Sequence, residues 1–235
     1  MTSLPCRRRP LRRSPFVLAR LAMWALLALF LAAGPLAREA DAAAPAAAAL
    51  TAQDRADVQR VEDYLNGIHT LDARFQQFSQ DGGTSGGKVY VQRPGRMRFE
   101  YDKPNPILLI ADGTFVVYID YSLKQTTYLP IGSTPAWFLL RDHISLSDGV
   151  TITRFERGPG VLRISVVENK SPENGTLTLV FSDKPLELKQ WTIVDQQGKI
   201  TTVSLSDPHY GAPLDPKLFT FVDPNPKKNP GDNGK

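Results

Sequence analysis

A serine set between glycines is the first candidate for chemistry in this sequence. Gly83, Ser85 and Gly87 complete a G-x-S-x-G pattern, which is the nucleophile elbow of many hydrolases. That elbow needs a strand before the serine and a helix after it, whereas residues 88–91 here are typical of a strand. Because no compelling Asp/His pair follows in triad order, a hairpin loop explains these small residues better than an esterase built on Ser85.

The possible metal ligands are few and scattered. His69, His143 and His209 show neither H-x-x-x-H nor H-x-H spacing, and Cys6 is the single cysteine. No phosphate-binding loop and no dinucleotide-binding fingerprint is present. We therefore expect no metal and no cofactor, and no enzymatic activity.

The charge distribution argues against nucleic acid as a partner. The chain has a net charge of +4 and a pI near 9.2. Residues 1–42, however, hold seven of the 28 Lys and Arg residues and two of the 24 Asp and Glu residues, which leaves 21 basic and 22 acidic residues beyond them. Since the basicity belongs to the leader, the electrostatic support for nucleic-acid binding is lost.

The leader has the pattern of a secretory signal peptide. Six arginines between Arg7 and Arg20 precede an apolar run from Leu21 to Leu36, and Ala40-Asp41-Ala42 supplies an A-x-A cleavage site. The alternative is an uncleaved anchor, but the apolar run is shorter than the roughly 20 residues that span a bilayer. We expect cleavage after residue 42 and a periplasmic product. Because Cys6 precedes the apolar run, the product is not itself expected to be lipidated.

The elements that must position any site are one amphipathic helix and a long series of strands. Thr51 and the apolar spacing of residues 58–68 predict a helix over 52–67, after a spacer of residues 43–50. Turn residues such as Asp112-Gly113 separate the strands. The expected strands are roughly 71–80, 86–92, 96–101, 107–111, 114–120, 124–128, 150–157, 161–168, 176–181, 186–195 and 200–206.

The short linkers favour an antiparallel up-and-down meander, which must curl towards a barrel at this number of strands. A short apolar helix over residues 134–140 interrupts it and has to be buried. We expect one domain over 51–222 and a disordered tail over 223–235. The aromatic residues between Phe75 and Ile119 could form either an ordinary core or an apolar pocket, and composition does not separate the two.

Several motifs of the chain together point to one known family. They are residues 71–77, the run Gly87-Lys88-Val89-Tyr90-Val91-Gln92-Arg93-Pro94-Gly95-Arg96-Met97-Arg98-Phe99-Glu100-Tyr101, and residues 103–104, 110–113, 117–120, 134–140 and 215–221. With these motifs, most of residues 52–222 resembles the LolA family, the periplasmic carriers of outer-membrane lipoproteins.

The resemblance implies an incomplete antiparallel β-barrel (mainly β, α+β), with short helices forming a lid over a hydrophobic cavity. Arg93 takes the place of the arginine that latches the lid in this family. The ligand-binding residues carried over, including apolar residues of the lid, are Leu65, Leu71, Phe75, Tyr90, Met97, Phe99, Trp137, Phe138 and Leu140. The implied partners are acylated lipoproteins and an inner-membrane lipoprotein-releasing ABC transporter. Delivery through an outer-membrane receptor and direct delivery both stay open, and a monomer suits a shuttle.

Two other classes of function remain open at this point. One is a half-barrel that binds another lipid or a glycolipid, and the other is a sensor that detects mislocalised lipoproteins and signals to a partner. Sensors of this kind usually carry a further domain, for which residues 51–222 leave no room. The ligand that co-purifies with the protein would separate these functions.

Overall fold

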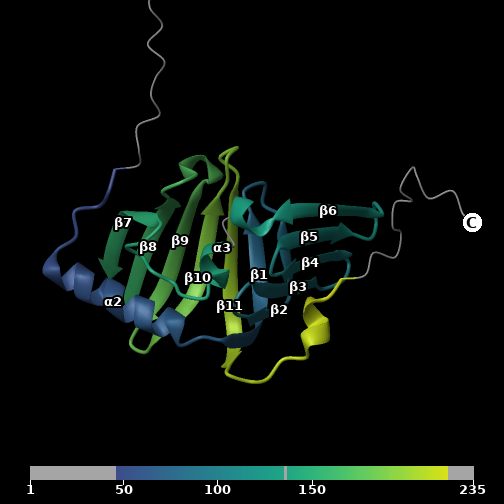
Figure 1. Ribbon diagram of the computed structural model, residues 1–235, viewed down its shortest axis with the longest axis horizontal. Coiled ribbons are helices and arrows are strands. Elements are labelled where there is room, and N and C mark those ends of the chain that lie inside the picture. Colours follow the sequence, from purple (N-terminus) through teal and green to yellow (C-terminus); the bar gives the residue numbers. More distant parts are fainter. Residues whose placement is uncertain (1–45, 135–136, 222–235) are drawn as a thin grey trace, which may run out of the picture. The chain divides into compact units, whose positions relative to one another are not determined.

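The computed structural model describes residues 46–134 and 137–221 (Figure 1). The predicted signal peptide, its cleavage site and the tail over 223–235 lie outside these residues. None of the described helices is both long and apolar enough to cross a membrane.

Eleven antiparallel strands form a single sheet, and the predicted strands are all present. Their bounds are β1 (Thr70–Ser79), β2 (Thr84–Gln92), β3 (Arg96–Tyr101), β4 (Ile107–Asp112), β5 (Phe115–Asp120), β6 (Gln125–Pro130), β7 (Val150–Gly158), β8 (Val161–Glu168), β9 (Thr176–Asp183), β10 (Leu186–Val194) and β11 (Ile200–Tyr210). The last strand runs four residues further than predicted, because its end pairs with β1: Tyr210 lies opposite Leu71.

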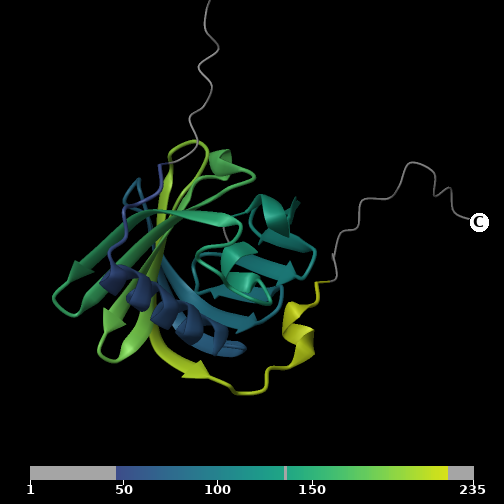
Figure 2. The ribbon, with the colours of Figure 1, turned by 60° about the vertical axis from the view of Figure 1, so that its left-hand side comes forward.

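The strand order differs from a single continuous meander. It is β6-β5-β4-β3-β2-β1-β11-β10-β9-β8-β7, so two meanders meet where β1 pairs with β11. A continuous meander would place β6 beside β7, whereas these strands form the two opposite edges of the sheet. The chain between them, residues 131–149, therefore has to cross from one edge to the other. The sheet stays open and curls around this crossing segment (Figure 2).

The helix predicted at the start of the domain is α2 (Ala52–Asn66). Thr51 caps it, since its side chain accepts a hydrogen bond from the Asp54 N–H while the Asp54 carboxylate accepts one from the Thr51 N–H. The buried residues Val58, Val61 and Leu65 recur every three to four positions and form the face turned to the sheet.

Charged side chains fasten the first half of α2 to the rim of the sheet. Asp57 is 5% exposed and accepts hydrogen bonds from Arg157 of β7, which also pairs with Asp54. Arg60 pairs with Asp183 at the end of β9. Because Asp54, Asp57 and Arg60 belong to α2 while their partners Arg157 and Asp183 belong to β7 and β9, the network holds this half of the helix against the sheet.

Two clusters of apolar side chains pack on opposite faces of the sheet. The large one lies on the concave face and includes α2, the short helix α3 (Trp137–Leu140) and residues from both meanders. The small one, on the other face of β4 and β5, comprises Leu108, Ile110, Val117 and Ile119 beneath Phe221. The short 3-10 turn η3 (Pro216–Phe219) leads to it, and Arg98 donates a hydrogen bond to the Leu218 carbonyl at 3.0 Å.

Candidate ligand-binding cavity and lid

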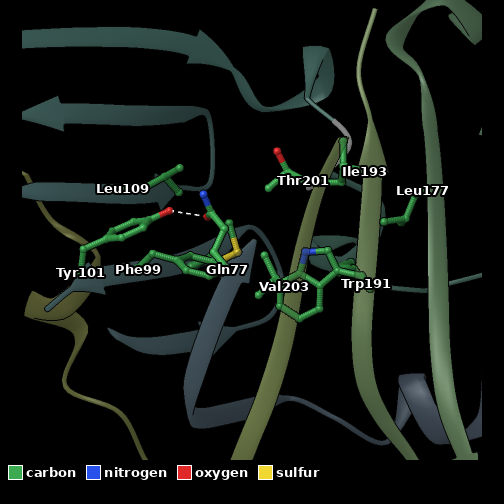
Figure 3. A pocket seen from close by; sticks show the side chains of 11 residues that line it. Gln77, Phe99, Tyr101, Leu109, Leu177, Trp191, Ile193, Thr201 and Val203 are labelled. Atoms are coloured by element: carbon green, nitrogen blue, oxygen red, sulfur yellow. Dashed lines mark hydrogen bonds between the residues drawn. The ribbon is translucent and has the colours of Figure 1, made fainter. Parts of the chain in front are cut away.

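An apolar cavity of about 180 Å³ opens on the concave face, between the two meanders and beneath α3 (Figure 3). It is lined by side chains from both meanders and from α3: Gln77, Met97, Phe99, Tyr101, Leu109, Leu139, Leu177, Trp191, Ile193, Thr201 and Val203. With α3 in place, a cavity of this volume has no room for several long acyl chains.

Aromatic rings form the floor of this cavity. Phe75 meets Phe99 and Tyr101 edge to face, with ring centroids 4.8 and 5.1 Å apart, and Phe99 meets Trp191 at 6.3 Å. Gly87 lies opposite Phe75 in the sheet and makes this packing possible. A Cβ at Gly87 would come within 2.8 Å of the Phe75 ring and 1.9 Å of the Glu100 carbonyl oxygen. Gly87 thus serves close packing inside a strand rather than loop flexibility.

One hydrogen bond joins two of the lining side chains. The Tyr101 hydroxyl donates to Oε1 of Gln77 at 2.7 Å (Figure 3). Burial raises the pKa of Tyr101 to about 12, an effect that nearby Tyr118 increases and the bond to Gln77 opposes. The pair therefore stays neutral at physiological pH and adds polar atoms, but no charge, to the apolar wall.

The lid over the cavity is the helix α3. All four of its residues pack against the concave face, with Phe138 and Leu140 each 2% exposed and Leu139 lining the cavity. A helix that is apolar on every side needs apolar surroundings, and here the curved sheet supplies them. The Arg141 guanidinium lies 4.9 Å from the centre of the Trp137 ring and makes a cation–π contact with it.

The turn between β2 and β3 holds the ends of both helices. Arg93 donates from Nη2 to the carbonyl of Asn66, the last residue of α2, at 3.3 Å. The Gly95 N–H donates to the carbonyl of Leu140, the last residue of α3, at 2.8 Å. Carbonyls at helix ends lack partners within the helix, so each bond satisfies a group that would otherwise be orphaned.

The environment of Arg93 makes its bond to Asn66 weak for a charged donor. Burial lowers the pKa of Arg93, and the charge of Asp142 opposes this shift. Its Nε is buried without a partner among the described residues. The guanidinium is therefore partly desolvated and only partly bonded.

The end of α2 and the segment that follows α3 are also bonded to each other. The side-chain amide of Asn66 donates to the Ile144 carbonyl at 2.8 Å and accepts from the Ile144 N–H at 2.9 Å. The Glu62 carboxylate accepts from the N–H of Leu146 and from the Ser145 hydroxyl. The end of α2 and the segment that follows α3 are therefore joined independently of Arg93.

The predicted site residues do not all reach the cavity. Met97 and Phe99 line it, while Leu65, Leu71 and Phe75 are buried in the apolar cluster around it. From the lid, Leu140 is buried in the same cluster, and Trp137 and Phe138 line a second pocket of about 20 Å³ beside β8 and β9.

Tyr90 lies on the other face of β2. Its strand neighbours Val89 and Val91 belong to the concave cluster, and Tyr90 is half-buried opposite Arg98 of β3. Successive side chains of a strand point to opposite faces, so Tyr90 does not face the cavity. A role for it in ligand binding stays a prediction.

The sequence analysis missed the wall that the second meander supplies. Leu177, Trp191, Ile193 and Val203 come from β9, β10 and β11, and Leu139 comes from the lid. The alternation of apolar residues in these strands marks an inward face, but it does not show which strands of the first meander stand opposite. The pairing of β1 with β11 decides this.

The residues first considered for chemistry are apart from the cavity. Ser85 lies within β2, opposite Gln77, and is followed by strand rather than by a helix. The geometry of a nucleophile elbow is therefore absent at Ser85. Within residues 46–134 and 137–221, no group of three or more His, Cys, Asp and Glu side chains is arranged to hold a metal ion.

The family model and the curated relatives indicate the same family. The model of the family described as "Outer membrane lipoprotein carrier protein LolA" matches residues 66–222. The chain is 33% identical to an outer-membrane lipoprotein carrier protein of Methylococcus capsulatus over 70% of its length and 83% of the relative's. It is 34% identical to one of Pseudomonas aeruginosa over 72% and 85%.

Among solved structures, it is similar to a LolA superfamily protein from Nitrosomonas europaea, with 11% identity, a TM-score of 0.41 and coverage of 74% of this chain and 99% of that one. The family match extends from the end of α2 to the residue after Phe221 and so includes the sheet, the turn at Arg93 and the lid. The chain belongs to the LolA family of outer-membrane lipoprotein carrier proteins.

Proposed function

We propose that this protein is a periplasmic carrier that takes lipoproteins from the inner to the outer membrane, with their acyl chains held in the cavity beneath α3. The observation that carries the proposal is the apolar cavity whose lid is itself an apolar helix, latched at its end by the turn of Arg93 to Gly95. Membership of a family named for this task supports it.

The physical need for such a carrier follows from the cost of exposing acyl chains. Each methylene buried away from water is worth about 0.8 kcal/mol, so two or three long chains amount to tens of kcal/mol. A carrier must shield them and still release them. A lid that occupies the concave face when the protein is empty meets both needs, because the net affinity is the difference between two buried states.

The cavity as it stands requires the lid to move. A volume near 180 Å³ cannot hold two or three long chains, whereas removal of Phe138, Leu139 and Leu140 would expose the concave face that they now cover. The charged network at Asp57 holds the first half of α2, so we expect α3 and the segment joined to Asn66 to move most.

The residues proposed to contact acyl chains are those of the floor and the lid. Met97 and Phe99 contact ligand in the closed cavity, and Leu65, Leu71, Phe75, Trp137, Phe138 and Leu140 become accessible when the lid opens. Arg93 is the latch. Binding and release of a ligand need no catalytic group, and we propose no enzymatic role.

The location and partners complete the proposal. Residues 1–42 direct export and are removed, and residues 51–222 form the carrier domain. An inner-membrane ABC transporter that releases lipoproteins would load the protein. Unloading takes place at the outer membrane, with or without a receptor. A monomer is sufficient for each step.

The test is to purify the protein from the periplasm and identify its ligand by mass spectrometry. Co-purification of triacylated lipoproteins, and their release from inner-membrane preparations on addition of the pure protein, is the expected result. A glycolipid or another free lipid as the main ligand would favour the alternative lipid-binding function, and failure to release lipoproteins would overturn the carrier function.

A further inference from the structure

We infer that Gln77 and Trp191 form a pair of hydrogen-bond donors that bind the carbonyl oxygens of acylated ligands inside the cavity. This inference rests on the proposed function and deepens it, because it concerns how the same cavity recognises its ligand. The carbonyl end of each acyl group would bind to side chains of the sheet, and its hydrocarbon chain would contact the aromatic floor and the lid.

Gln77 presents donors because Tyr101 occupies its acceptor. The Tyr101 hydroxyl donates to Oε1 at 2.7 Å, which fixes the orientation of the amide. The Nε2 group, with two hydrogens, then points away from Tyr101 towards Leu109 at the wall of the cavity (Figure 3). An amide that is held by its oxygen in this way offers only donors to a ligand.

The indole N–H of Trp191 is a further hydrogen-bond donor, on the opposite side of the cavity from Gln77. Its side chain is 8% exposed, and its indole nitrogen is turned towards the open part of the cavity (Figure 3). Among the lining side chains drawn in Figure 3, the one hydrogen bond is that between Tyr101 and Gln77. The indole N–H is not among the buried polar atoms that lack a partner in the described residues, so it is accessible from the cavity, where a ligand acceptor can replace water.

The sheet register places the two donors in one row. Gln77 of β1 and Trp191 of β10 are both paired with Val203 of β11, on the inner face. Two steps between neighbouring strands separate their backbones by roughly 10 Å. The donors therefore flank Val203, and a ligand lying over Val203 is within reach of both side chains.

The donors of Gln77 and Trp191 select a ligand by its chemistry. Acyl esters and amides carry carbonyl oxygens that accept hydrogen bonds, whereas a hydrocarbon chain or an ether of the same shape leaves the donors without carbonyl partners. Both donors belong to the sheet rather than to α3, so they stay in place when the lid opens. Carbonyls bound in this row direct the chains along Phe99 and Leu177 into the space that Leu139 vacates.

The experiment compares two synthetic lipopeptides in which the two chains on the glyceryl cysteine are joined either by esters or by ethers. Affinities are measured by displacement of a fluorescent acyl probe from the purified protein. We expect the ester form to bind about two- to tenfold more tightly for each carbonyl that gains a hydrogen bond. A diester phospholipid with the same chains forms a separate arm and shows whether the pair serves any acyl ester or the lipopeptide in particular.

Three variants assign the preference to the pair. Gln77→Leu and Trp191→Phe should each reduce the preference for esters. Gln76→Leu, at the exposed neighbouring position on the opposite face, should keep it. If Gln77→Leu does not fold, Tyr101→Phe, which releases the amide, should reduce the preference in its place.

The outcomes separate this inference from the proposed function. Equal binding of ester and ether forms by the natural protein overturns the inference and leaves the carrier function standing. Binding of neither form overturns the carrier function itself. An ester preference that survives in both Gln77→Leu and Trp191→Phe also overturns the inference.

Discussion

Replacement of Arg93 by leucine should weaken closure of the lid without affecting folding. The guanidinium donates one bond, at 3.3 Å, to the carbonyl of Asn66 at the end of α2, and Asn66 is in turn bonded to Ile144 in the segment that follows the lid. The backbone bond from Gly95 to Leu140 does not depend on the Arg93 side chain. The variant therefore keeps one of the two bonds from this turn. We expect Arg93→Leu to fold normally and to close its lid less firmly.

The size of the effect follows from the geometry. A well-formed hydrogen bond from a charged group contributes about 1.5–3 kcal/mol. This bond is long at 3.3 Å, so we expect it to contribute about 1 kcal/mol. Because lid closure competes with the ligand, the loss raises the open population and the apparent affinity for acyl chains about fivefold.

Titration of a fluorescent acyl probe measures this change, and Arg96→Leu is the matched control because Arg96 is exposed at the start of β3. Transfer of bound lipoprotein to outer-membrane vesicles should be slower for Arg93→Leu in proportion to its tighter binding. An unchanged or weaker affinity in a folded Arg93→Leu protein, or efficient delivery by it, would refute the role of Arg93 as a latch.

Three further predictions concern the packing around the cavity. Folding favours the neutral form of Tyr101, which contributes about 2–3 kcal/mol to the free energy of unfolding. This contribution is complete below pH 10 and is lost as the pH rises from about 10 to about 12. Tyr101→Phe should abolish that part of the alkaline loss of stability, as measured by urea unfolding. Asp57→Asn should lower the free energy of unfolding by about 2 kcal/mol, less than the loss of a fully buried ion pair, because the arginine partners of Asp57 are partly exposed. Asp63→Asn, at an exposed position of α2, is the control and should change the free energy of unfolding by less than about 0.5 kcal/mol. Gly87→Ala should cost about 3 kcal/mol or more, while Gly132→Ala, whose new Cβ meets nothing within 4 Å, should fold normally in circular-dichroism melts.

Local patterns in the sequence were sufficient to predict the elements. Thr51 and Asp54 form the predicted helix start, and the turn signals separate strands whose bounds differ from the structure by a few residues. These signals work because capping and turn formation depend on residues within about four positions of each other.

The order of the strands could not be predicted in this way. Pairing of β1 with β11 joins residues more than a hundred positions apart, such as Gln77 and Val203, and no local signal specifies it. This pairing places the second meander opposite the first and so creates half of the cavity wall. Trp191 and Ile193 were missed for this reason.

Within the first meander, the choice of face was the main difficulty. Met97 and Phe99 line the cavity, whereas Tyr90 lies on the opposite face of its strand. In a strand, either the aromatic residue or the two valines beside it can face the core. In β2 the buried Val89 faces the core, so Tyr90 faces the other side. In α3, a helix of four apolar residues has no polar side to orient it, so Leu139 could not be distinguished from its neighbours.

Fluorescence of Trp191 tests most directly whether acyl chains occupy the cavity. The sequence has tryptophan at positions 24, 137 and 191, so Trp137→Phe in a protein of residues 43–235 leaves Trp191 as its tryptophan. A lipopeptide whose acyl chains carry a brominated quencher is titrated into this protein. We predict saturable quenching of Trp191 that parallels binding and is competed by unlabelled lipopeptide. Binding of the lipopeptide without quenching of Trp191 would contradict the account.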